Sequence, residues 1–257
     1  MTAIVAIVKK DGIVVYSDGA CYGRDGTLAF ERQKTDVLMH IPCIIAARGE
    51  HQQGRWLKYA LDWYDVRDFD GLVDLMPSLL THAADFAPRV DEPINLCVLF
   101  GGWSERSSSW ELYRAVVNAD EGSEVKKVPT AFYSEPVPPR EMLIAYGLMK
   151  DEGLDLRGGD QSMIRYMHCQ RQAKFAFGPS HQGEESTGCI VGSFIQRTAL
   201  ATDEAATEII YRWPDEVGEP LGLSYFDMTP KMLAYFEERE ATLRTEGKPS
   251  ELIVWQE

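Results

Sequence analysis

The chain has 257 residues, of which 45% are hydrophobic and 26% charged. This composition is typical of a globular protein and excludes a disordered, collagen-like or disulfide-scaffold class. Its 40 acidic residues outnumber its 26 Lys and Arg and give a net charge of -14, spread along the chain. Because such a surface repels phosphate groups, we expect neither a nucleic-acid partner nor a membrane partner.

The sequence predicts a cytoplasmic protein with reduced thiols. The amino terminus is apolar and reaches its first charges only at Lys9 and Lys10, the reverse of a secretion signal. Apolar runs such as 41–47 and 94–100 are far shorter than the roughly 20 residues of a membrane-spanning helix. The five cysteines are an odd number and form no C-x-x-C pair, which is unlike a disulfide framework.

The first predicted elements form a β-hairpin that is buried on both faces. Residues 3–8 and 13–17 would place apolar side chains on both faces of their strands, and the Asp11-Gly12 pair between them is typical of a tight turn. Continuous apolar character predicts a sheet that is covered above and below. A second strand pair is expected at 28–39 and 43–47.

Helical spacing of apolar residues then predicts two helices, one around Trp56–Trp63 and one over 72–86, with Pro77 bending the second or marking its start. The remaining expected elements are strands at 94–100 and 110–117, a loop with one edge strand at 118–139, helices at 140–150 and 161–174, strands at 188–200 and 207–213, a helix after Thr229, and a strand at 250–256. This order predicts a single domain over residues 1–257, with two sheets between two helical layers.

Three residues stand out for their chemistry: Thr2, Asp18 and Lys34. In a hairpin, the end of the returning strand lies beside the start of the first, so Asp18 is expected within a few residues of Thr2. If Met1 is removed, the freed α-amine of Thr2, whose pKa is roughly 8, can accept the proton of the threonine hydroxyl. Lys34 would favour the neutral amine, and Asp18 would fix the lysine. With Met1 retained, the amine becomes an amide without useful basicity.

These residues carry a resemblance to the N-terminal nucleophile hydrolases of the proteasome β-subunit and HslV type. The similar segments are Thr-Ala-Ile-Val-Ala-Ile-Val from Thr2, Gly-Ile-Val-Val-Tyr-Ser-Asp-Gly from Gly12, Lys34, and Ile-Ile-Ala-Ala-Arg-Gly from Ile44. The resemblance implies an α+β fold, a four-layer αββα sandwich, in subunits that assemble into peptide-cleaving rings. It also implies that Thr2 is the nucleophile, that Lys34 tunes its amine, and that Asp18 orients the lysine.

The resemblance extends to supporting groups. The family's oxyanion donor is a backbone amide in a glycine-containing loop after the fourth strand, which corresponds here to Ala46, Ala47, Arg48 and Gly49. A second supporting site corresponds to Glu184 and Thr187. At the position of the family's Gly-Ser-Gly type loop, this sequence has residues 133–139, which lack those glycines. The chain is also longer than HslV, and we expect the additional residues to form a loop insertion at 118–140 and a helix-strand extension at 214–257.

The sequence therefore predicts a cytoplasmic threonine peptidase that acts as a homo-oligomer, in a ring or stack, on a peptide or another amide. Two alternatives stay open: an amidohydrolase with the same nucleophile, and a non-catalytic structural or assembly subunit. The sequence has no dinucleotide-binding, phosphate-loop or serine-elbow motif, so we expect no cofactor. Its five histidines are scattered, so we expect no metal site.

Overall fold

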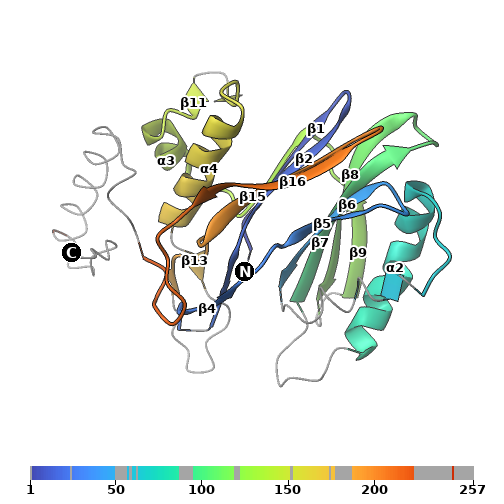
Figure 1. Cartoon of the computed structure of the whole chain (residues 1–257), viewed down its shortest axis with the longest axis horizontal. Helices are drawn as coiled ribbons and strands as arrows, with labels where there is room; N and C mark the ends of the chain where they lie inside the picture. The colour runs from blue at the N-terminus through green and yellow to red at the C-terminus, as the bar shows by residue number, and fades with distance from the viewer. Residues whose placement is uncertain are drawn as a thin grey trace. The chain divides into compact units, whose positions relative to one another are not determined.

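The computed structural model describes residues 2–23, 25–49, 57, 60–61, 63–86, 95–118, 122–150, 153–173, 175–176, 187–222 and 245 (Figure 1). The chain divides into two compact units. Unit 1 comprises Met1–Ser17, Gln33–Glu135 and Gln196–Ile209, and unit 2 comprises Asp18–Arg32, Pro136–Ile195 and Ile210–Glu257.

Most of the first sheet belongs to unit 1, and its strand order is β10-β1-β2-β15-β16. Lys9 pairs with Gly12, so a two-residue turn joins the first two strands, as short hairpins prefer. A side chain at Gly12 would lie 2.2 Å from the carbonyl oxygen of Leu200, so close packing requires a glycine there. The strands are β1 (Ile4–Lys9), β2 (Gly12–Asp18), β10 (Phe132–Glu135), β15 (Phe194–Ala201) and β16 (Ala205–Arg212).

The second sheet of unit 1 is antiparallel, in the order β5-β6-β7-β8-β9. Helix α2 (Phe69–Phe86) covers one face of it, as Figure 1 shows, and packs its apolar side chains on those of the sheet. Pro77 lies inside this helix. The strands are β5 (Thr35–Leu38), β6 (Cys43–Gly49), β7 (Asn95–Ser104), β8 (Ser109–Asn118) and β9 (Gly122–Lys127).

An apolar core joins the two sheets of unit 1. Ile4, Ala6 and Val15 of the first sheet pack in one buried cluster with Ile44 and Leu99 of the second. Unit 1 therefore stacks one described helix and two sheets. The described residues are mostly antiparallel strands with three helices, so the four-layer αββα sandwich expected from the sequence is wrong. Apolar periodicity predicts which segments are buried, but it does not fix how many layers they form.

Unit 2 contains the other two described helices and three two-stranded ladders. Its helices are α3 (Arg140–Ala145) and α4 (Asp160–Gln172), and its ladders are β3 (Ala20–Tyr22) with β4 (Leu28–Glu31), β11 (Met149–Lys150) with β12 (Gly153–Leu154), and β13 (Phe175–Ala176) with β14 (Thr187–Gly188). In the part of the chain that the structure describes, no helix is long and apolar enough to span a membrane.

Several predicted elements differ from the structure. The strand expected at 28–39 is two strands, β4 and β5, because the backbone between them bonds elsewhere: the Arg32 N–H donates to the Gly19 carbonyl at 2.9 Å. The segment expected as a loop with one edge strand at 118–139 contributes two edge strands, β9 and β10. The helix expected at 140–150 ends at Ala145. Most of the helix near Trp56, the helix after Thr229 and the strand at 250–256 lie outside the described residues.

Candidate functional site

Thr2 and Asp18 lie at the same end of the β1–β2 hairpin. The last registered pair at this end is Ile4 with Ser17, so Thr2 precedes that pair by two residues and Asp18 follows it by one. Both side chains are buried: Thr2 is 5% exposed and Asp18 is 0% exposed. Burial of a polar side chain costs free energy unless hydrogen bonds or an ion pair compensate for the lost water.

Lys34 lies directly before β5 and is only 6% exposed. Its backbone N–H donates to the Gln196 side-chain oxygen at 3.1 Å, and the Gln196 amide nitrogen donates to the Thr35 carbonyl at 2.6 Å. The Thr35 hydroxyl donates to the Ser17 hydroxyl at 2.9 Å. Ser17 precedes Asp18 in the chain, and Thr35 follows Lys34. One buried hydrogen bond therefore joins the chain neighbour of Asp18 to the chain neighbour of Lys34.

Asp18 is held by backbone donors within unit 2. Its Oδ2 accepts from the Ala20 N–H at 3.1 Å and from the Gly192 N–H at 3.4 Å. The following residue, Gly19, donates its N–H to the Phe194 carbonyl at 2.9 Å. A side chain at Gly19 would lie 2.4 Å from the Phe194 ring, so this approach requires a glycine. The Asp18 carboxylate is therefore fixed in part by a residue 174 positions away in the sequence.

Ser193 is a residue that the sequence did not single out. Its φ is 67°, in the left-handed region that residues with a side chain rarely adopt. Its side chain is fully buried, and its hydroxyl has no hydrogen-bond partner. Strained backbone and unpaired buried hydroxyls are both uncommon, and both concentrate at functional sites. No local sequence signal predicts either feature.

The predicted oxyanion loop is a strand. Ala46, Ala47, Arg48 and Gly49 belong to β6, where all four pair with β7. The pairing of β6 with β5 ends at Ala46, opposite Thr35. Beyond that pair, Ala47, Arg48 and Gly49 have no registered partner in β5. Their proposed role as oxyanion donors stays a prediction.

The Arg48 side chain binds Glu135 of β10, the strand residue that pairs with Ile4. Glu135 also accepts from the Tyr133 hydroxyl and lies 3.6 Å from Arg114. Burial, followed by the Glu135 carboxylate, raises the pKa of the Cys97 thiol to about 11. Burial raises the pKa of the Cys43 thiol to about 12. Both thiols stay protonated at neutral pH, so neither is an activated nucleophile.

The second supporting site is not described fully. Glu184 lies outside the described residues, and Thr187 is known only by its backbone, in β14. Both assignments stay predictions. Among the described residues, no group of three or more His, Cys, Asp or Glu side chains could hold a metal ion.

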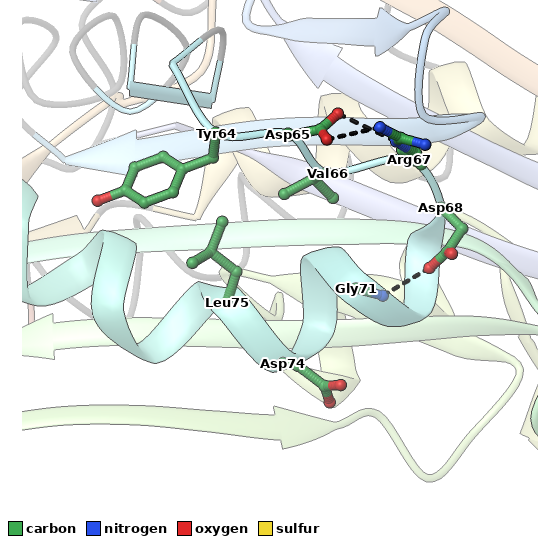
Figure 2. A pocket seen from close by; sticks show the side chains of 8 residues that line it. All are labelled: Tyr64, Asp65, Val66, Arg67, Asp68, Gly71, Asp74 and Leu75. Carbon is green, nitrogen blue, oxygen red and sulfur yellow. Dashed lines mark hydrogen bonds and ion pairs between the residues drawn. The ribbon is translucent and has the colours of Figure 1, made fainter.

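A shallow pocket in unit 1 lies elsewhere, at the start of α2 (Figure 2). Arg67 donates to Asp65 at 2.7 Å, and Asp68 accepts from the Gly71 N–H at 2.7 Å. Asp74 pairs with Arg106, which holds the pKa of that carboxyl below its usual value. Each charged side chain that lines this pocket therefore has a protein partner, and none is placed as an acid or a base for catalysis.

No family model and no curated protein matches the sequence. Solved structures with a similar fold include Anbu (ancestral beta-subunit) from Yersinia bercovieri, with a TM-score of 0.54 and 12% identity over 98% of this chain and 100% of that one. A Gly-1 mutant of Anbu from Hyphomicrobium sp. strain MC1 has a TM-score of 0.56 and 12% identity over 96% and 100% of the two chains.

These comparisons correct the family assignment made from the sequence. The first fifty residues indicated an N-terminal nucleophile hydrolase of the proteasome β-subunit or HslV type, but no family model matches and 12% identity shows a likeness of fold alone. What the comparisons support is a fold similar to Anbu, a proteasome-like β-subunit relative. A short run of matching residues at matching spacing is a weaker criterion than a match over the chain.

Proposed function

We propose that the chain hydrolyses amide bonds with Thr2 as its nucleophile, once Met1 has been removed. The freed α-amine takes the proton of the threonine hydroxyl as the hydroxyl attacks the carbonyl carbon, and returns it to the leaving amine. The same amine then takes a proton from water, which attacks the acyl ester on Thr2, releases the acid and restores the hydroxyl. Lys34 keeps the amine neutral by its positive charge, and Asp18 orients the lysine. A backbone amide of 46–49 stabilises the oxyanion. The substrate class is a peptide or another amide, cleaved within a homo-oligomer.

The observation that carries this proposal is the hydrogen bond of 2.9 Å between the Thr35 and Ser17 hydroxyls. It joins the start of β5 to the end of β2, next to Lys34 and Asp18. Gln196 fixes the same segment from β15, because it bonds both Lys34 and Thr35. Buried side-chain networks of this kind hold a set of groups in one geometry, which is what a preorganised site requires.

The test is hydrolysis by the full chain and by two variants of Thr2. Intact mass first establishes that Met1 is lost. Fluorogenic peptides and a non-peptide anilide are then offered to the wild type, Thr2→Ala and Thr2→Ser. We expect Thr2→Ala to lose all activity and Thr2→Ser, which keeps a hydroxyl, to retain part of it. Activity that survives Thr2→Ala contradicts the assignment of the nucleophile.

A second candidate is a non-catalytic structural or assembly subunit with the same fold. The observation that favours it is the structure of residues 132–135, which form the edge strand β10 where the resemblance predicts a serine-bearing loop. The Glu135 carboxylate in this strand is paired with Arg48. This candidate predicts a processed Thr2 that neither hydrolyses the substrates nor reacts with a threonine-directed covalent inhibitor such as a β-lactone.

A further inference from the structure

Unit 2 contains a buried ion pair, Arg171 of α4 with Asp215. Their side chains are 3% and 6% exposed. The guanidinium donates to both carboxylate oxygens, at 2.7 Å and 2.5 Å, and also to the carbonyl oxygens of Val191 and Gly222. It lies over the Trp213 ring, 5.1 Å from the ring centre. This is bidentate geometry, which arginine provides and lysine does not.

The ion pair holds the turn that binds Asp18. Asp215 Oδ2 accepts from the Ser193 N–H at 2.6 Å, and Arg171 binds the Val191 carbonyl at 2.9 Å. Between these two residues lies Gly192, whose N–H donates to Asp18 Oδ2 at 3.4 Å. A side chain at Gly192 would lie 2.7 Å from the Asp215 carboxylate and 2.8 Å from the guanidinium. The 191–193 turn is therefore fixed on both sides of the residue that contacts Asp18.

A buried ion pair is a poor way to stabilise a fold, because desolvation of two charges offsets most of their attraction. Apolar residues of similar size would fill the same volume. What the charges provide, and apolar side chains cannot, is two directed bonds to the backbone of the turn: one to the carbonyl of Val191 and one from the amide of Ser193. The strained φ of Ser193 requires such external support.

We propose that Arg171 and Asp215 are positioning residues that set the orientation of the Asp18 carboxylate through the 191–193 turn. This inference rests on the proposed function, in which Asp18 orients Lys34. Neither residue of the pair contacts the substrate in this proposal. Its specific consequence is that a change in the pair alters turnover rather than substrate affinity.

The test uses Asp215→Asn and Arg171→Lys in the processed full chain. In Asp215→Asn, the new side-chain oxygen can still accept the Ser193 N–H, but its NH₂ group then faces the guanidinium. In Arg171→Lys, the charge is kept, but one ammonium group cannot bind Asp215, Val191 and Gly222 together. We expect kcat to fall about 10- to 100-fold in both, as for small displacements of catalytic groups, with KM changed less than about twofold.

The matched control is the pair of Arg157, whose side chain is 81% exposed, with Asp155, in which the guanidinium also binds both carboxylate oxygens. Asp155→Asn and Arg157→Lys make the same chemical changes in a pair whose arginine lies at the surface. We expect both control variants to keep the kcat of the wild type. A fall in kcat equal to that of the buried pair would mean that loss of an ion pair, and not the turn, slows the reaction.

Hydrogen exchange at the Gly192 and Ser193 amides separates the outcomes. We expect exchange at least about tenfold faster in both buried-pair variants, with the β1–β2 hairpin amides unchanged as a check on folding. Faster exchange with unchanged kcat overturns the positioning role. Unchanged exchange overturns the inference that the ion pair holds the 191–193 turn. This readout does not depend on activity, so it still applies if the wild type shows no Thr2-dependent hydrolysis and the proposed function fails by itself. If Asp215→Asn does not fold, Arg171→Lys alone decides.

Discussion

Gln196 offers the most direct test of how Lys34 is held. Its side chain is fully buried and makes three hydrogen bonds: from the Lys34 N–H, to the Thr35 carbonyl, and to the Thr198 hydroxyl at 2.9 Å. Gln196→Leu keeps the volume and removes all three. Thr198 still has its hydrogen bond with Thr207 at 3.3 Å. The groups that lose Gln196 as a partner are therefore the Lys34 N–H and the Thr35 carbonyl.

Each buried backbone group left without a partner costs about 1–3 kcal/mol, so the two together cost about 2–6 kcal/mol. The greater hydrophobicity of leucine returns about 1 kcal/mol or more of that cost. We therefore expect Gln196→Leu to lower the free energy of unfolding by about 3 kcal/mol. The assay is urea denaturation, in which the midpoint falls while the slope stays unchanged.

The matched control is Gln161→Leu, because Gln161 is exposed in the first turn of α4 and surface substitutions change stability by only about 0.5 kcal/mol. An equal effect of the two substitutions would refute the reasoning, because it would mean that the bonds of Gln196 do not hold the segment. If Lys34 acts as proposed, Gln196→Leu also slows hydrolysis under conditions where the variant is fully folded.

Two further predictions concern charge and assembly. Burial alone would raise the pKa of Glu111, but hydrogen bonds from Lys127, Ser107 and Tyr113 outweigh burial and lower that pKa. The ionised Glu111 carboxylate therefore stabilises the fold above about pH 4.5, and this stabilisation is lost as the pH falls. Glu111→Gln should flatten the pH dependence of the unfolding midpoint between about pH 3 and 5, and equal acid sensitivity of the variant and the wild type would contradict this. The proposed homo-oligomer should give a light-scattering mass well above the 29.0 kDa of one chain, and a monomer would remove that part of the proposal.

The sequence predicted the first hairpin and its burial because both faces of the two strands are apolar, and their register follows from a short turn. It also predicted that Thr2 and Asp18 lie at the same end of this hairpin, since that follows from topology. These are local inferences, in which the residues that matter are close in sequence or joined by one turn.

The sequence could not predict what depends on distant partners. The break between β4 and β5 is set by Gly19 and Gln196, and Gln196 lies 162 residues beyond Lys34. Arg171 and Asp215 are separated by 44 residues and have no motif around them. Glu135 was interpreted as part of a loop, yet it pairs with Ile4 and binds Arg48. Apolar patterning indicates burial but does not tell which polar side chains meet inside.

The choice between an enzyme and a structural subunit can be argued from the cost of its buried polar groups. A subunit that only assembles needs apolar packing at the ends of β1 and β2, and an aliphatic side chain in place of Lys34 would avoid the desolvation of an ammonium group. The chain instead buries Thr2, Asp18 and Lys34, and it fixes Asp18 by a turn with a strained serine. Features that reduce stability without improving packing are characteristic of sites kept for chemistry, so this pattern favours the catalytic proposal over the structural one.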